Sequence, residues 1–286
     1  MNSTLLSPIV IIGAGQMGSG IALTCASKGF KVYLTDSNEA ALKKAEQGLA
    51  ATASKLQTQG ILSASEEASL TKNLGFLPRF EQQDCGLVIE AATENEAIKT
   101  AIFADLHKRL PPRCIFASNT SSLSITRLAA AVSHPERFIG MHFMNPVPKM
   151  RLLEIIPGLA TSTTTLSTMQ SFARQLNKEV VISRDYPGFI VNRVLMPMIN
   201  EAFTVLMEGI ASREEIDLAM KLGTNQPMGP LALADYIGLD TCLSILEIMH
   251  QDLASSRFKP CPLLRQYVAA HWLGRKTGRG VYVYER

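Results

Sequence analysis

Two residues near the middle of the chain, His142 and Glu154, have side chains that could carry out acid–base chemistry. His142 directly follows the apolar residues 138–141, and Glu154 lies inside the largely apolar run 151–156. Both runs are predicted to be strands, and an unpaired charge buried in such a strand is costly. If the strands pair across the proline-rich residues 145–148, the carboxylate can hydrogen-bond the imidazole, fix its tautomer and raise its basicity. The pair then predicts a general base, although an isolated histidine is more often structural.

Polar side chains at three further places could contact a substrate. Asn192 begins an otherwise apolar helix face, and a buried amide there needs hydrogen-bond partners; a capping role in the first helical turn is the alternative. Ser121 and Ser122 could hydrogen-bond a substrate oxygen or cap the short helix that follows. A basic cluster near the carboxyl end could contact phosphates or form a solvated turn, and it consists of Arg275, Lys276 and Arg279.

The residues that must position this chemistry begin with a glycine turn. The β-branched run 9–12 predicts a buried strand, and a G-x-G-x-x-G motif follows it before a helix that extends to about Lys28. In this motif Gly13 permits the tight turn, Gly15 lets the backbone approach a pyrophosphate, and Gly18 lets the helix lie close to the strand. The free N–H groups of the helix would face the pyrophosphate. The alternative is a βαβ unit whose glycines serve only packing.

Asp36 lies at the carboxyl end of the second predicted strand, residues 31–35. A carboxylate there can accept hydrogen bonds from the ribose 2′-hydroxyl and repels a 2′-phosphate. The sequence therefore predicts that NAD is bound in preference to NADP.

Composition limits the class of protein. The chain has 286 residues, of which 47% are hydrophobic and 19% charged, so it is long enough for two domains and a large core. A net charge of +3 is too small to indicate nucleic acid or an acidic membrane surface as a partner. No apolar run approaches the roughly 20 residues of a membrane span. The five scattered cysteines lack a C-x-x-C pair and indicate reduced thiols in the cytoplasm, without a metal site.

The order of the predicted elements gives the fold class. Strands are expected at residues 86–90, 114–117, 138–142 and 151–156 and at a last run ending at Ile182, with helices between most of them, which is typical of a doubly wound sheet. From Pro187 the chain reads as helices, expected at residues 189–208, 213–221, 231–252 and 262–272, with one doubtful strand near Val281. We expect an α/β, Rossmann-type NAD-binding domain at residues 1–186 and an all-helical domain at residues 187–286.

Seven motifs, in order along nearly the whole chain, resemble those of the L-3-hydroxyacyl-CoA dehydrogenases, especially the short bacterial 3-hydroxybutyryl-CoA dehydrogenases. The motifs are GAGQMG at 13–18, SNTSSL at 118–123, HFMNP at 142–146, LLE at 152–154, PGFIVNR at 187–193, PMGP at 227–230 and GRKTG at 274–278. Jointly they are highly specific. The departures are Met144, where the family usually has a second Phe, and Lys149, where a small or apolar residue is common, and both leave the acyl-chain preference open.

The resemblance implies a role for each matching residue. His142 resembles the base that takes the 3-hydroxyl proton while hydride passes from C3 to nicotinamide C4, and Glu154 resembles its orienting partner. Ser121 and Asn192 resemble the groups that hold and polarise the substrate oxygens, and Lys55 falls near the expected CoA phosphates. The implied cofactor-binding residues are Gly13, Gly15, Gln16, Met17, Gly18, Asp36, Glu94, Lys99, Asn145 and Lys276.

The resemblance also implies NAD as cofactor, an acyl-CoA substrate and a homodimer formed through the helical domain. The activity expected is the interconversion of (S)-3-hydroxyacyl-CoA, with a short chain such as 3-hydroxybutyryl, and 3-oxoacyl-CoA. Two alternatives stay open: a β-hydroxyacid dehydrogenase that acts on free acids, and a catalytically silent NAD-binding structural protein.

Overall fold

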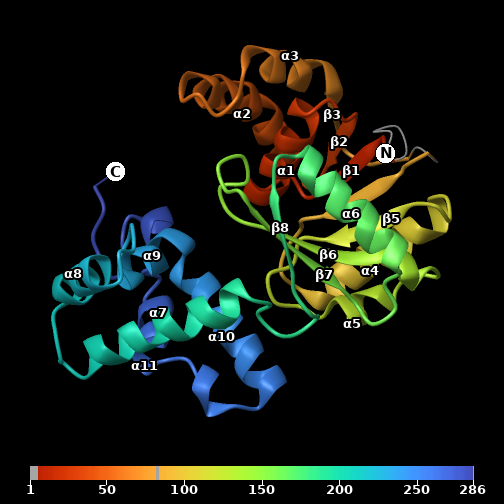
Figure 1. Ribbon diagram of the computed structural model, residues 1–286. Helices are drawn as coiled ribbons and strands as arrows, with labels where there is room; N and C mark the ends of the chain where they lie inside the picture. The colour runs from red at the N-terminus through yellow and green to blue at the C-terminus, as the bar shows by residue number, and fades with distance from the viewer. Residues whose placement is uncertain (1–5, 82–83, 286) are drawn as a thin grey trace. The chain divides into compact units, whose positions relative to one another are not determined.

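A computed structural model describes residues 6–81 and 84–285 of the protein. The chain forms two compact units, Met1–Tyr186 and Pro187–Arg286 (Figure 1). Each unit has its own apolar core, and each is described by itself below.

The first unit is built on an eight-stranded sheet in the order β3-β2-β1-β4-β5-β6-β7-β8. All neighbouring strands pair in parallel except β6 and β7, which are antiparallel. The strands are β1 (Ile9–Ile12), β2 (Val32–Thr35), β3 (Leu74–Leu77), β4 (Leu87–Glu90), β5 (Ile115–Ser118), β6 (Phe138–Phe143), β7 (Leu152–Pro157) and β8 (Glu179–Ile182). With the helical second unit, this sheet confirms the predicted fold class.

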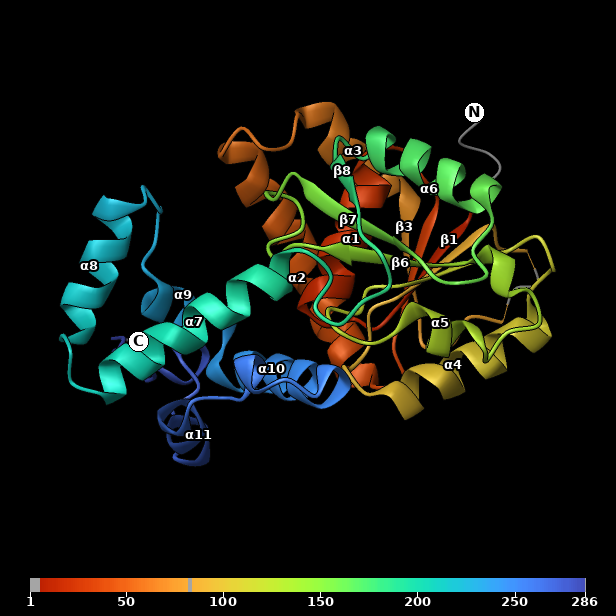
Figure 2. The same ribbon diagram turned by 60° about the horizontal axis from the view of Figure 1, so that its bottom comes forward.

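Helices cover both faces of the sheet (Figure 2). On one face lie α1 (Gln16–Ser27) and α6 (Thr163–Gln175), where the rings of Phe30 and Phe172 meet with centroids 5.1 Å apart. On the other face lie α4 (Glu96–Arg109) and α5 (Ile125–Ala129), where Phe103 packs edge-on against Phe138 at 4.7 Å. Burial of such aromatic side chains on both faces excludes water from the sheet and fixes the strand ends that carry the polar loops.

A helical hairpin of α2 (Glu39–Thr58) and α3 (Ala64–Asn73) follows β2. The Asn38 side chain caps α2, and Ser63 with Glu66 forms a capping box at the start of α3. Strand β3, which follows α3, was not predicted from the sequence. It has four residues and includes Gly75, which weakens the strand signal; a Cβ there would lie 3.0 Å from the Tyr33 ring.

The second unit is helical, as predicted, but its helix boundaries differ from the expected ones. Its helices are α7 (Val191–Met207), α8 (Arg213–Gly223), α9 (Pro230–Ile237), α10 (Leu239–Leu253) and α11 (Pro262–Ala269). The single helix expected at 231–252 is wrong: Gly238, with φ 106° and ψ 124°, separates α9 from α10. The helix expected from Phe189 starts two residues later because Phe189 has φ 50°. Near Val281 the described residues form only isolated bridges, which pair Arg279 with Gly274 and Val283.

Short 3₁₀ turns complete the chain: η2 (Pro135–Arg137), η3 (Ser256–Phe258) and η4 (Arg275–Thr277). Within the described ranges, no helix is both long and apolar enough to cross a membrane.

Candidate functional site

The antiparallel pairing of β6 and β7 places His142 directly opposite Glu154. Residues opposite each other on antiparallel strands project from the same face, so the two side chains meet. His142 Nδ1 lies 2.7 Å from Glu154 Oε2. The imidazole is 7% exposed and the glutamate is fully buried. The strand pairing that the sequence analysis required is therefore present, and it brings the predicted pair into contact.

This contact defines which imidazole nitrogen can act as a base. An ionised carboxylate only accepts hydrogen bonds, so the proton of a neutral imidazole is on Nδ1 when it bonds to Glu154. The basic lone pair is then on Nε2. Because the surroundings are buried, a charge-assisted hydrogen bond of this kind is stronger than it would be in water.

The glycine turn packs closely at two of its glycines and is open at the third. Gly13 has φ 104°, and a Cβ there would lie 2.6 Å from the Ala91 carbonyl oxygen, while a Cβ on Gly18 would lie 1.8 Å from the Gly13 oxygen. Packing therefore explains these two glycines. At Gly15 a Cβ would meet nothing within 4 Å, so packing does not require a glycine there. Gly15 is exposed at the N-cap of α1, which has no side-chain cap, so the site fits an approaching anion.

Asp36 lies beside this turn. One carboxylate oxygen accepts a hydrogen bond from the Ala14 amide at 2.7 Å, and the other accepts one from the Asn38 amide at 2.8 Å. These bonds fix the carboxylate at the carboxyl end of β2, and the residue is only half-buried. This is the position where a ribose hydroxyl would bind in a Rossmann-type site.

Glu94 organises the loop that carries Ser121. Its Oε1 accepts hydrogen bonds from the Thr120 hydroxyl at 2.6 Å, the Ser121 amide at 2.8 Å and the Ser121 hydroxyl at 3.0 Å, and Ser122 adds two more. Burial alone would raise the pKa of Glu94, but the Lys99 ammonium and these hydrogen bonds lower it below its ordinary value. Glu94 is therefore an ionised acceptor that holds residues 120–122 together.

Lys99, which was predicted to contact the dinucleotide, is completely buried. Its Nζ lies 2.7 and 2.8 Å from the two oxygens of Glu90 and 3.6 Å from Glu94 Oε2. Since water does not reach this ammonium, a direct contact with a ligand would require the side chain to move, and the contact stays a prediction. The sequence analysis gave Glu90 no role, although an acid that ends a buried strand is itself a signal. Glu90 also accepts a hydrogen bond from the Ser118 hydroxyl at 2.6 Å.

Asn119 links the serine loop to the strand of His142. Its Oδ1 accepts a hydrogen bond from the Phe143 amide at 2.9 Å. The carboxyl ends of β4, β5 and β6 are thereby tied together, which agrees with the ligand-binding edge of an open parallel sheet. This contact was not predicted, because no local sequence pattern indicates which main-chain amide will donate to an asparagine side chain.

The remaining predicted residues lie in other parts of the chain. Asn145 is exposed just after β6, and Lys55 is exposed in the last turn of α2. In the second unit, Asn192 is buried in the first turn of α7. Lys276 lies in η4, where its ammonium is 2.5 and 2.7 Å from the two oxygens of Asp240. Their ligand contacts stay predictions.

Comparisons with known proteins agree with this geometry. Residues 8–186 match the model of the 3-hydroxyacyl-CoA dehydrogenase NAD-binding domain, and residues 188–284 match the model of the C-terminal domain of the same family. The chain is 51% identical over 286 residues to a 3-hydroxybutyryl-CoA dehydrogenase of Bradyrhizobium diazoefficiens, with 99% of this chain and 97% of the relative covered. A probable 3-hydroxybutyryl-CoA dehydrogenase of Bacillus subtilis is 51% identical over 285 residues, with 98% of each covered.

A solved structure shows the same fold. The crystal structure of (S)-3-hydroxybutyryl-CoA dehydrogenase from Ralstonia eutropha superposes with a TM-score of 0.91 at 48% identity, covering 97% of this chain and 99% of that one. The fold, the glycine turn and these matches define an NAD-dependent oxidoreductase. The chain belongs to the 3-hydroxyacyl-CoA dehydrogenase family, and the predicted family, enzyme class and cofactor are confirmed.

Proposed function

We propose that the protein interconverts (S)-3-hydroxybutyryl-CoA and acetoacetyl-CoA, with His142 as general base and Glu154 as its orienting partner. The observation that carries the proposal is the 2.7 Å contact between His142 Nδ1 and Glu154 Oε2 at the carboxyl end of β6. The substrate class is supported by the two relatives at 51% identity, whose names specify 3-hydroxybutyryl-CoA.

His142 moves the proton in this reaction. In the oxidative direction Nε2 takes the proton of the 3-hydroxyl group, and the ionised Glu154 stabilises the imidazolium that forms. In the reductive direction the imidazolium returns the proton to the 3-oxo oxygen. NAD, when bound, supplies the hydride acceptor for this chemistry.

Other residues of the first unit hold the ligands. Gly15 gives the pyrophosphate room at the start of α1, and Asp36 accepts from the ribose hydroxyls. We propose that the Ser121 hydroxyl, which donates to Glu94 in this structure, donates to the substrate oxygen instead when substrate is bound, because the single proton of the 3-hydroxyl group goes to His142 Nε2. Lys55 is proposed to attract the CoA phosphates because it is an exposed cation at the end of α2.

The second unit contributes Asn192 and the contact between two copies of the chain. The Asn192 amide is proposed to hold a substrate oxygen. Several apolar side chains of this unit are more than half exposed, which favours an interface with a second copy. They are Val194, Ile210, Leu218, Leu222 and Val283. Sedimentation equilibrium checks the homodimer: a monomer at micromolar concentration would contradict it.

The substrate proposal is tested by steady-state oxidation of NADH. Acetoacetyl-CoA is expected to support turnover, and free acetoacetate is expected to be a poor substrate. Turnover with free acetoacetate at an equal kcat/KM would instead show a β-hydroxyacid dehydrogenase. NADH binding without turnover of any 3-oxoacyl-CoA would show a catalytically silent protein.

The assignment of the base is tested by His142→Gln. We expect kcat to fall by at least about a hundredfold, the usual effect of losing a general base, with little change in the Kd of NADH. A near-normal kcat in this variant would refute the role of His142.

A further inference from the structure

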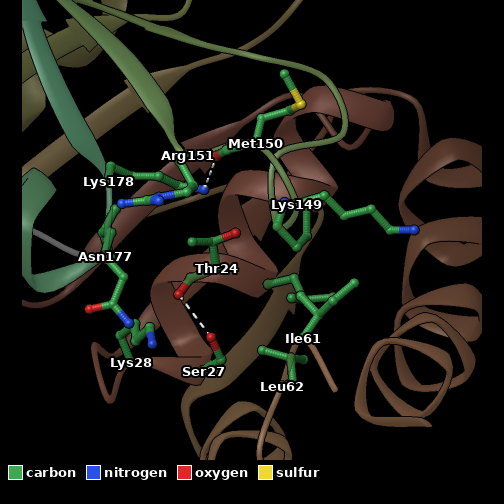
Figure 3. Close-up of a pocket in the computed structure, with 13 residues that line it drawn as sticks. Thr24, Ser27, Lys28, Ile61, Leu62, Lys149, Met150, Arg151, Asn177 and Lys178 are labelled. Atoms are coloured by element: carbon green, nitrogen blue, oxygen red, sulfur yellow. Dashed lines mark hydrogen bonds between the residues drawn. The ribbon is translucent and has the colours of Figure 1, made fainter. Parts of the chain in front are cut away.

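The loop between β6 and β7 is held by a buried lysine from a distant part of the chain. Lys178, which precedes β8, is 7% exposed. Its ammonium donates to the Val147 carbonyl oxygen at 2.5 Å and to the Met150 carbonyl oxygen at 2.7 Å. Figure 3 shows the Lys178 side chain reaching Met150 above a pocket formed by α1, the α2–α3 turn and this loop.

Lys178 has an unusual electrostatic environment for a buried cation. In the described parts of the chain it forms no ion pair with a carboxylate, and burial lowers the pKa of Lys178 to about 8. The ammonium is therefore stabilised by hydrogen bonds to these two carbonyl oxygens. A buried ammonium without a carboxylate partner needs these acceptors, so the position of the lysine and the position of the loop depend on each other.

The opposite side of the same loop packs against the dinucleotide helix. A Cβ on Gly20 of α1 would lie 3.1 Å from the Cβ and Cγ2 atoms of Val147, so a larger residue there would have to displace the loop by a few tenths of an ångström. Val147 is 2% exposed. The loop is closed internally as well, because the amides of Lys149 and Met150 both donate to the Pro146 oxygen, at 3.0 and 3.1 Å.

We propose that Lys178 is a positioning residue that, together with Gly20, fixes the 145–150 loop and so places Asn145 for contact with the dinucleotide. The inference rests on the proposed function through Asn145 alone. It does not involve the histidine, because the main-chain pairing of β6 with β7 fixes His142 opposite Glu154 independently of the loop. The inference therefore predicts an effect on cofactor affinity that is larger than the effect on kcat.

The first test measures the loop without any ligand. Lys178→Met fills the same space and removes the donors. We expect the amides of Lys149 and Met150 to exchange with deuterium about tenfold faster, because hydrogen bonds from a charged group are lost. Lys72→Met, which removes an exposed lysine on α3, is the control and should leave these amides unchanged. Unchanged exchange in Lys178→Met would overturn the proposal whatever the cofactor does.

The second test measures the Kd of NADH by fluorescence at a temperature where every variant is folded. Lys178→Met should raise the Kd about tenfold, and Lys178→Arg, which keeps the donors, should recover part of the loss. Gly20→Ala should also raise the Kd, although alanine stabilises the α1 helix itself. A merely structural role would lower the unfolding temperature without this shared loss of affinity.

Asn145→Ala distinguishes a failure of the positioning role of Lys178 from a failure of the proposed Asn145 contact. If it weakens NADH binding while Lys178→Met and Gly20→Ala stay within twofold of the unmodified protein, the positioning role is overturned. If Asn145→Ala has no effect, the Asn145 contact in the proposed function is wrong, and the exchange of Lys149 and Met150 still decides whether Lys178 holds the loop.

Discussion

Replacing Glu154 by glutamine tests the central contact with almost no change in shape. The variant keeps an oxygen that can accept from His142 Nδ1, so the imidazole retains its orientation, but the negative charge is lost. Glu154 is fully buried, and the distance between the bonded atoms is 2.7 Å. The effect of the variant therefore isolates the electrostatic contribution of the carboxylate.

The size of this contribution follows from Coulomb's law. Two unit charges about 4 Å apart interact by about 4 kcal/mol at an effective dielectric constant of about 20. The proton is only partly transferred in the transition state, so roughly two thirds of this energy, about 2.7 kcal/mol, is lost, and kcat falls about a hundredfold. The Kd of NADH should change little because the glycine turn is untouched.

The assay is the oxidation of (S)-3-hydroxybutyryl-CoA by NAD, both at saturation, followed at neutral pH. Glu179→Gln is the matched control, since it removes an exposed carboxylate from the neighbouring strand β8 and should leave kcat within twofold. A kcat for Glu154→Gln within twofold of the unmodified protein would show that the carboxylate does not support the base. A larger loss accompanied by unfolding would be recognised by circular dichroism.

Four further variants test the rest of the site. Asp36→Ala should lower the ratio of kcat/KM for NAD to that for NADP at least about tenfold, because the carboxylate that repels a 2′-phosphate is gone; an unchanged ratio would contradict the ribose contact. Gly15→Ala should fold normally but bind NADH at least about tenfold more weakly, whereas Gly18→Ala should lose about 3 kcal/mol or more of folding free energy, since its Cβ would lie 1.8 Å from a carbonyl oxygen. Glu94→Gln should lower the free energy of unfolding at pH 7. The folded-state pKa of Glu94 lies below its unfolded value of about 4.5, so the ionised carboxylate stabilises the folded protein above pH 4.5. This difference should shrink as the pH falls below 4.5 through the folded-state pKa, and urea titrations at pH 7 and pH 3.5 measure it; a pH-independent difference would refute the reasoning.

The sequence predicted those features that depend on periodicity and short motifs. Apolar runs predicted strands at His142 and Glu154, the proline-rich loop between them allowed these strands to pair, and the structure places the two residues opposite each other. The glycine turn was also predicted from the sequence, and the structure shows a packing reason for Gly13 and Gly18. The contact of Glu94 with the serine loop was not predicted, since hydrogen bonds between loops depend on how neighbouring strands bring them together.

Features that depend on tertiary contacts could not be predicted from local sequence patterns. Strand β3 was missed because Gly75 lowers its strand propensity, and only the structure shows that a Cβ there would crowd the Tyr33 ring. The break at Gly238 was missed because a single glycine inside a helical pattern does not by itself reveal a positive φ. The pairing of Lys99 with Glu90 depends on burial of both groups between β4 and α4, which no pattern of charges along the chain indicates.

The antiparallel pairing of β6 with β7 tolerates changes of length in the connecting loop but not within the two strands. Inserting or deleting one residue within either strand would turn every following side chain to the opposite face, so the imidazole and its carboxylate would be separated by the sheet itself. A change of length confined to the connecting loop would leave that pairing intact. A change of loop length would therefore alter the surroundings of Asn145 without separating His142 from Glu154.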